Sequence, residues 1–69
     1  MITFKPLFKL LSEKNMTVEE LAEKSGVSRI TMKRIEKDAN VSVAVLARFC
    51  QALGCDFKDI MEYVEEDQA

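Results

Sequence analysis

A chain of 69 residues has room for one domain, so residues 1–69 are expected to fold as a single unit. Two cysteines are too few for a disulfide-rich scaffold, and the absence of histidine excludes a mixed Cys/His zinc site. The formal net charge of −2 argues against a nucleic-acid binder only if the charge is spread evenly along the chain.

The charge is in fact unevenly distributed. Residues 1–55 hold nine Lys or Arg against six Asp or Glu, a net +3, whereas residues 56–69 hold one lysine against six carboxylates, a net −5. Residues 24–37 alone carry +4, with five basic side chains and one acidic one. Because the screening length at physiological salt is about 8 Å, a phosphate backbone responds to the local charge. We expect the acidic C-terminal tail, residues 62–69, to point away from any DNA.

No segment is apolar enough to enter a membrane. Lys5, Pro6 and Lys9 interrupt the apolar residues near the N-terminus, so no signal peptide is expected, and no stretch approaches the roughly 20 apolar residues of a membrane span. The composition favours a cytoplasmic protein in a reducing compartment, with Cys50 as a buried thiol and Cys55 as a partly exposed one. No flanking base supports a redox role for Cys55.

The N-terminal segment predicts a short strand followed by a helix. Ile2 and Phe4 are two residues apart, which is the period of a half-buried strand. Such a strand needs the other end of the chain or another subunit as its partner, because isolated strands are unstable. Pro6 suits the first turn of a helix, and an apolar stripe follows it at Leu7, Phe8, Leu10 and Leu11.

The next two predicted helices are short and closely spaced. Thr17 and Glu20 form a capping box, in which the Thr hydroxyl accepts from the amide of residue 20 and the Glu side chain reaches back. Gly26 ends this second helix, and Ser28 caps the third. The stretch 37–41 then breaks the helical periodicity.

Two more helices are predicted in the C-terminal half. Ser42 caps a fourth helix that Gly54 closes, and its apolar side comprises Val45, Leu46, Phe49, Cys50 and Leu53. Asp56 opens a short fifth helix with three inward residues, Phe57, Ile60 and Met61. The stretch 61–64 is ambiguous between the end of this helix and a strand.

The most informative segment is a helix-turn-helix motif at residues 17–36, TVEELAEKSGVSRITMKRIE. Ala22 lies where the two helices would cross, because a larger side chain would push them apart. Gly26 supplies the left-handed backbone that the turn requires. Met32 and Ile35 fill the angle between the helices. Four further residues complete the predicted core: Leu21, Leu46, Phe49 and Leu53.

The chain resembles the lambda-repressor/Cro-like helix-turn-helix family, also called the xenobiotic-response-element class. Two segments carry the resemblance, which spans residues 5–62: Leu21-Ala-x₃-Gly26-Val-Ser-x₂-Thr-Met-x₂-Ile-Glu36 and residues 41–60. It implies an all-α fold, a five-helix lambda-repressor-like DNA-binding domain. In some short stand-alone members the chain termini add a small two-stranded antiparallel sheet, which suits both ends of this chain.

Two positions depart from the family pattern. Many members have Gly two residues after the Glu that ends the third helix, where this chain has Asp38. Many also have Pro where this chain has Val41. Because Asp tolerates the left-handed region, the loop can still turn, but its phosphate contacts are less predictable.

The resemblance implies that the third helix enters the major groove of double-stranded DNA. Arginine can donate two hydrogen bonds to guanine, and an exposed isoleucine can pack on a thymine methyl group. The residues predicted to contact bases are Arg29, Ile30, Lys33 and Arg34. Those predicted to contact the DNA backbone are Thr17, Ser28, Lys37 and Asn40. No metal, cofactor or small-molecule ligand is expected.

Simpler interpretations exist for the same residues. Arg29, Lys33 and Lys37 could form an ordinary solvated helix face, which would be the preferred interpretation without the surrounding motif. Ile30 could be a dimer contact or a harmless exposed residue.

We expect a homodimer, because so short a chain buries only about 60% of its unfolded surface and because one recognition helix contacts few base pairs. Two-fold dimers are also the commonest assembly. The predicted dimer surface comprises Ile2, Phe4, Phe57, Ile60, Met61, Tyr63 and Val64. The alternative is that these residues complete the core of a single chain, which then pairs only on DNA.

The function predicted from these features is a transcriptional regulator, a repressor acting on a palindromic operator. A protein-interaction module, such as an antitoxin or a regulator that docks onto another protein, is the alternative that the acidic tail leaves open. An enzyme is the weakest interpretation, since the chain has no histidine, no glycine-rich phosphate loop and no room for a sizeable pocket.

Overall fold

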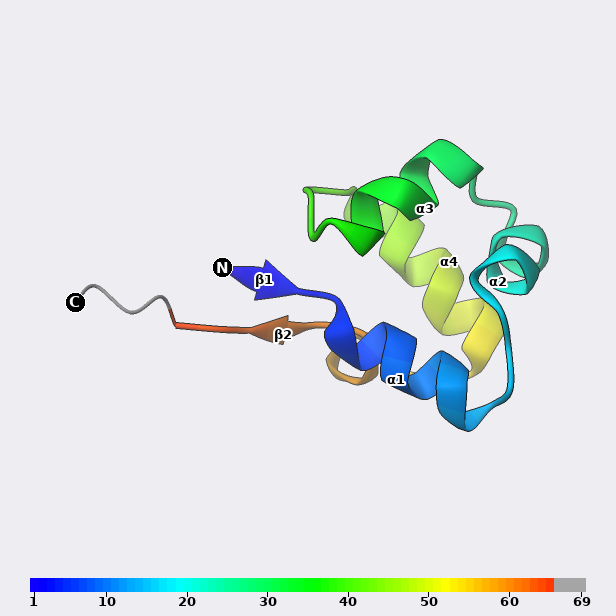
Figure 1. The fold of residues 1–69 in the computed structure, drawn as a ribbon, viewed down its shortest axis with the longest axis horizontal. Coiled ribbons are helices and arrows are strands. Elements are labelled where there is room, and N and C mark those ends of the chain that lie inside the picture. The colour runs from blue at the N-terminus through cyan, green and yellow to red at the C-terminus, as the bar shows by residue number, and fades with distance from the viewer. Residues whose placement is uncertain (66–69) are drawn as a thin grey trace.

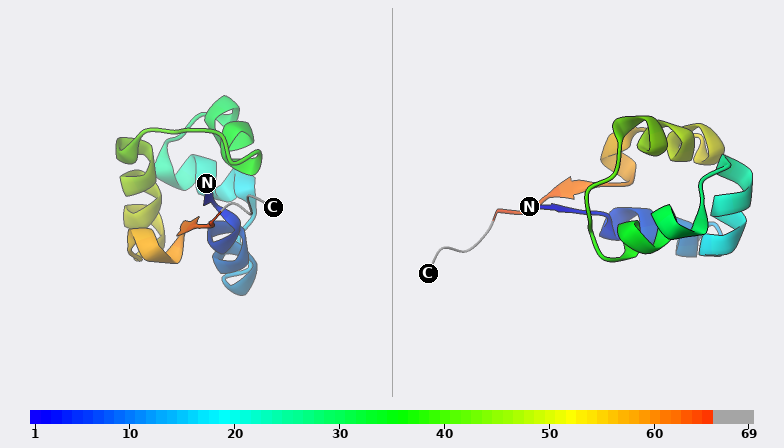
Figure 2. Two further views of the ribbon diagram at one scale, coloured as in Figure 1. Left: turned by 90° about the vertical axis from the view of Figure 1, so that its left-hand side faces the viewer. Right: turned by 90° about the horizontal axis from the view of Figure 1, so that it is seen from above.

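The computed structural model describes residues 1–65, so the last four residues of the predicted acidic tail lie outside the described part. Within residues 1–65 there are four α-helices: α1 (Lys5–Glu13), α2 (Val18–Ser25), α3 (Arg29–Glu36) and α4 (Val43–Leu53). Two short strands, β1 (Ile2–Thr3) and β2 (Glu62–Tyr63), extend together from one end of the helices (Figure 1). The helices surround a single core, and the strands project from it (Figure 2).

The predicted fifth helix is wrong. Asp56 opens only a 3₁₀ turn, η1 (Phe57–Asp59), in which Asp56 N–H donates to Asp59 Oδ2 at 2.9 Å. The chain leaves the helical conformation because Glu62 and Tyr63 pair with the N-terminal strand. The fold is therefore mainly helical as predicted, but residues 1–65 contain four α-helices and not five.

The predicted terminal sheet is confirmed, and it assigns residues 62–63 of the ambiguous stretch to a strand. β1 and β2 are antiparallel, with Ile2 opposite Tyr63 and Thr3 opposite Glu62. The N-terminal amine donates to Val64 O at 2.8 Å, and Val64 N–H donates to Met1 O at 2.7 Å. Each strand thus supplies the partner that an isolated two-residue strand lacks.

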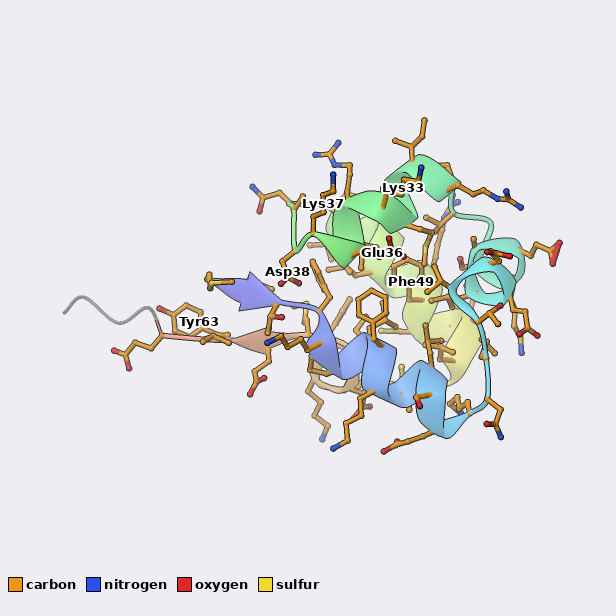
Figure 3. The ribbon with its side chains drawn as sticks, in the orientation of Figure 1. Lys33, Glu36, Lys37, Asp38, Phe49 and Tyr63 are labelled. Atoms are coloured by element: carbon orange, nitrogen blue, oxygen red, sulfur yellow. The ribbon has the colours of Figure 1, made fainter. Side chains whose placement is uncertain are left out.

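The core is built from apolar residues of all four helices. Phe49 of α4 lies at its centre and is fully buried (Figure 3). The seven predicted core residues are all buried: Leu21, Ala22, Met32, Ile35, Leu46, Phe49 and Leu53. The remaining members of the core are Phe4, Leu7, Leu11, Val27 and Ile60.

This core corrects part of the predicted dimer surface. The side chains of Phe4 and Ile60 are only 4% and 0% exposed, because they pack inside the single chain. Neither is free to contact another subunit. For these two residues the alternative, completion of the intramolecular core, is correct.

Candidate nucleic-acid interface

The helix-turn-helix motif is formed by α2 and α3, which pack against each other. Gly26 ends α2 with φ +73°, in the left-handed region predicted for it. Its N–H donates to Ala22 O at 2.9 Å, and Val27 N–H donates to the same carbonyl at 3.1 Å. Ala22 is 7% exposed. The turn therefore depends on one backbone conformation and one small side chain.

Side-chain caps fix where both helices begin. Thr17 Oγ1 accepts from Glu20 N–H at 3.0 Å, and Thr17 N–H donates to Glu20 Oε1 at 3.0 Å, so the predicted capping box is present. The hydrogen bond from the Thr17 backbone N–H, and after it hydrogen bonding with the Thr17 side chain, lowers the pKa of the Glu20 carboxyl. Ser28 Oγ accepts from Thr31 N–H at 3.2 Å and so caps α3.

The outward face of α3 is exposed and basic. Met32 and Ile35 point into the core, whereas the four predicted base contacts and two of the predicted backbone contacts are exposed: Arg29, Ile30, Lys33 and Arg34, with Ser28 and Lys37. Lys33 and Lys37 project away from the side of α3 that faces Phe49 (Figure 3). Ile30 is 75% exposed and therefore contributes nothing to the core.

Arg34 connects α3 with the loop that follows it. Its Nη2 donates to Asn40 O at 3.1 Å. Arg34 and Asn40 line a surface hollow of about 350 Å³ together with Thr31, Val41, Ser42 and Val45. The structure thus brings a predicted base contact and a predicted backbone contact together beside the start of α4.

The three capped helix N-termini differ in charge, which decides how well each suits a phosphate. The first turn of α2 holds Glu19 and Glu20, whose carboxylates would repel an anion next to Thr17. The first turns of α3 and α4 hold no acidic residue. Ser42, the cap of α4, accepts from Val45 N–H at 3.2 Å.

Sequence reasoning identified Ser42 only as a cap and passed over Thr31. A serine cap followed by a first turn free of carboxylates was the available signal for Ser42. Thr31 had no such signal, because its place in the hollow depends on the path of the later loop.

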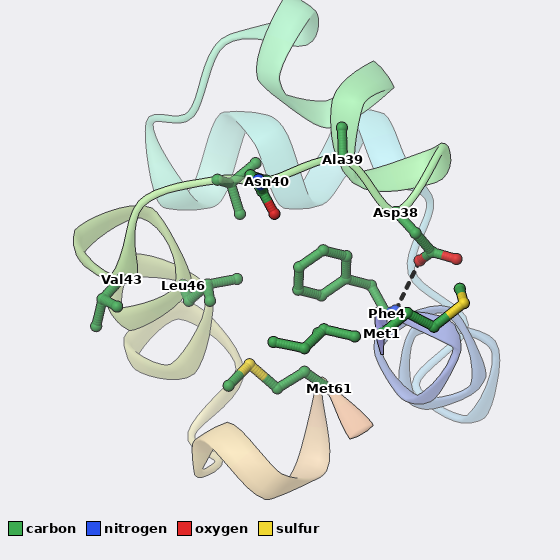
Figure 4. A pocket seen from close by; sticks show the side chains of 10 residues that line it. Met1, Phe4, Asp38, Ala39, Asn40, Val43, Leu46 and Met61 are labelled. Carbon is green, nitrogen blue, oxygen red and sulfur yellow. Dashed lines mark hydrogen bonds between the residues drawn. The ribbon is translucent and has the colours of Figure 1, made fainter. Parts of the chain in front are cut away.

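A second surface lies at the end of the molecule that carries the strands. Met1, Ile2, Val43, Tyr63 and Val64 are exposed apolar residues there, and Tyr63 is the most exposed at 73%. Phe57 and Met61, the other predicted dimer residues, are half-buried. Part of this surface is a hollow of about 460 Å³, lined mainly by apolar side chains, with Asp38 and Asn40 at one side (Figure 4).

The two cysteines are both half-buried free thiols, so Cys50 is less buried than expected. Burial is the main cause that raises the pKa of each thiol, which lowers the fraction of reactive thiolate at neutral pH. Among residues 1–65 there is no group of three or more His, Cys, Asp and Glu side chains that could hold a metal. No helix in that range is long and apolar enough to cross a membrane.

Comparisons with known proteins agree with the geometry of the motif. Residues 7–66 match the family model of the Cro/C1-type HTH DNA-binding domain. The chain is also similar to a solved crystal structure of the transcriptional regulator VanUg, with 42% sequence identity and a TM-score of 0.89. That similarity covers 94% of this chain and 87% of that one. A search of curated proteins gave no match.

Proposed function

The chain belongs to the Cro/C1-type helix-turn-helix DNA-binding family, and from that premise we propose that it binds a specific double-stranded DNA site as a homodimeric transcriptional repressor. Helix α3 enters the major groove and its exposed side chains contact base edges. The observation that carries this proposal is the outward face of α3, where four cationic side chains flank Ile30.

Each side chain on this face has a role suited to its chemistry. Arg29 and Arg34 donate paired hydrogen bonds to guanine, and Ile30 packs against a thymine methyl group. Lys33 adds a further donor to a base edge. Arg34 keeps most of its five donors after its bond to the Asn40 carbonyl, so it can contact DNA while it holds the loop.

The backbone contacts come from the edges of the same surface. Ser28 and Lys37 lie at the two ends of α3, and Asn40 lies in the following loop. We add Ser42 to this set, because the start of α4 beside Asn40 has free amide dipoles and no carboxylate. Thr17 is the weakest member, since Glu20 already occupies the start of α2.

The dimer forms through the apolar surface beside the strands. Its exposed members are Met1, Ile2, Val43, Tyr63 and Val64, with Phe57 and Met61 half-buried next to them. A two-fold axis through this surface would relate two copies of α3, which could then reach successive major grooves about 34 Å apart on a palindromic operator. Such a self-complementary patch is the usual basis of a two-fold dimer.

The test of base contact compares three alanine variants by fluorescence anisotropy on a duplex selected from random DNA and on a scrambled duplex. Arg29→Ala should raise the Kd for the selected duplex by about tenfold to a hundredfold, and should blur the preference at one position. Lys37→Ala should weaken binding to both duplexes alike and reduce the slope of log Kd against log salt by about 1.

Lys9→Ala is the matched control. It removes one exposed positive charge from α1, which lies across the molecule from α3 (Figure 1). It should leave the ratio of the two Kd values unchanged. If Arg29→Ala kept the specificity of the wild type, the assignment of α3 as the base-contacting element would be wrong.

A further inference from the structure

Asp38 lies at a position where the local backbone conformation and the adjacent helix end both disfavour an aspartate. It follows α3 with φ +55°, in the left-handed region. The turn is a Schellman motif, in which Ala39 N–H donates to Arg34 O at 2.8 Å and Asp38 N–H donates to Ile35 O at 3.0 Å. Glycine is the usual residue at this point of the motif, and a carboxylate at a helix C-terminus is opposed by the helix dipole.

The Asp38 carboxylate is instead used by a distant part of the chain. Phe4 N–H donates to Oδ1 at 2.8 Å, and the Thr3 hydroxyl donates to Oδ2 at 3.2 Å. Figure 4 shows the first of these bonds, which joins the start of α1 to the end of α3. Thr3 is buried, 3% exposed, and its hydroxyl also accepts from Lys5 N–H at 3.3 Å.

These bonds supply what the local sequence lacks. Phe4 is the N-cap residue of α1, and Leu7, three residues later, has no side-chain oxygen that could accept from the Phe4 N–H as in a capping box; Asp38 accepts from that N–H instead. The main packing partner of α3 is α2, and that of β1 is β2. The carboxylate is therefore a direct polar link between the recognition helix and the paired strands.

We infer that Asp38 is a positioning residue for DNA binding: its carboxylate fixes the C-terminal end of α3 and the loop with Asn40 against the N-terminal strand. The strands and the DNA-contacting face then move as one unit. A second copy bound at the strands would consequently hold its α3 at a fixed orientation relative to the first. This inference rests on the proposed function for the identity of the ligand.

Three variants separate this role from local effects. Asp38→Gly relieves the left-handed strain and keeps the turn, but removes the link. Asp38→Asn makes the same change in charge and keeps an oxygen acceptor for the Phe4 amide. Asn15→Gly is the matched backbone control, because exposed Asn15 also has φ +55° in a Schellman turn, where Met16 N–H donates to Leu11 O at 2.9 Å.

The first measurement is amide hydrogen exchange without DNA, at a temperature where circular dichroism shows every variant to be folded. Asp38→Gly should accelerate exchange of the Phe4 amide by about tenfold or more, since a hydrogen bond to a charged acceptor is lost. Asp38→Asn should restore most of the protection. Asn15→Gly should leave the Phe4 amide unchanged.

The second measurement is the Kd for the selected and scrambled duplexes under the same conditions. Asp38→Gly should raise the Kd for the selected duplex by about tenfold relative to Asp38→Asn. Loss of the negative charge alone would act in the opposite direction, because it favours binding to phosphates. Asn15→Gly should bind like the wild type.

Two results would overturn the inference. Unchanged exchange of the Phe4 amide in Asp38→Gly would show that the link is not formed in solution. Faster exchange with an unchanged Kd and unchanged specificity would show that the link does not position α3. If the wild type itself bound no DNA selectively, the proposed function would fail, and the positioning role with it, whatever the Phe4 amide showed.

Discussion

We expect Ala22 and Gly26 to act on the motif through size and backbone conformation, since neither has a polar side chain. A Cβ at Gly26 would meet nothing closer than Arg48 Nη1 at 3.9 Å, so space would be available for a larger residue. The obstacle is φ +73°, which costs an L-residue about 1–2 kcal/mol. Gly26 is thus required by conformation, whereas we expect Ala22, which is 7% exposed on α2, to be limited by size.

Ala22→Leu should destabilise the protein in the absence of DNA. The added methyl groups would overpack the helix crossing at a cost of about 1–3 kcal/mol, and each kcal/mol lowers the Tm of a domain this size by about 4–8 °C. Ala47→Leu is the matched control, since Ala47 is exposed on α4. Differential scanning calorimetry measures both. A Tm for Ala22→Leu equal to that of the control would show that the crossing is not tightly packed.

Asp38 illustrates how a residue can be unfavourable locally and favourable in the folded chain. The helix-dipole and left-handed costs together amount to about 1–3 kcal/mol, and two hydrogen bonds to a carboxylate can offset them. The sequence indicated only that Asp38 stands where many members of the family have glycine. Its partners, Thr3 and Phe4, lie more than 30 residues away in the chain, so no local pattern could identify them.

At the scale of elements, the helix starts are where sequence and structure agree best. The caps at Thr17, Ser28 and Ser42 are all present as predicted. A cap involves a side chain and an amide three residues apart, so its formation depends on local sequence alone. The helix-turn-helix motif was predictable for the same reason.

The elements that were predicted incorrectly depend on contacts between distant residues. The apolar spacing of Phe57, Ile60 and Met61 is compatible with a helix, and the chain forms a 3₁₀ turn because Glu62 and Tyr63 pair with β1. Phe4 and Ile60 were assigned to a dimer surface because an apolar residue has the same pattern in a core and in an interface. Only the folded chain distinguishes the two locations.

The capping box of α2 should make stability depend on acidic pH. The folded-state pKa of Glu20 lies below its ordinary value of 4.5, so its charged form contributes stability above pH 4.5, and this contribution is lost as the pH falls through the lowered pKa. Glu20→Ala should therefore have a lower Tm than the wild type at pH 7, and the difference should shrink as the pH falls below 4.5.

Glu19→Ala is the control for this titration, because Glu19 lies in the same first turn and has no bond in the capping box. It should change the Tm less than Glu20→Ala does at pH 7. A difference between Glu20→Ala and the wild type that stayed constant from pH 7 to well below 4.5 would exclude the charged carboxylate as its source.

For the whole molecule, the distribution of exposed apolar residues is uneven. Among residues 1–65, five of the six large exposed apolar side chains lie in or beside the strands, and the sixth is Ile30 on α3. The five residues beside the strands therefore form a patch that suits a protein partner, and Ile30 lies on the face of α3 that is proposed to contact DNA. This patch is where a second copy is proposed to bind, and the link through Asp38 connects it with the end of α3, whose outward face is proposed to contact DNA.

Sedimentation equilibrium at micromolar concentration should give a dimer without DNA. Tyr63→Glu, which buries a charge in the proposed interface, should give a folded monomer. Ile30→Glu is the matched control, since the two side chains are 73% and 75% exposed, and it should remain dimeric. A wild type that stayed monomeric up to about 100 μM would exclude a dimer formed before DNA is bound.

Selection of bound duplexes from a random DNA pool tests the central claim, sequence-specific binding through α3, most directly. Sequencing of the bound fraction should reveal an enriched motif of two inverted half-sites with centres about 10 base pairs apart. The enriched duplex should bind at least about a thousandfold more tightly than a scrambled one at the same salt concentration. A pool that remained random after repeated selection, or equal affinity for the two duplexes, would contradict the account.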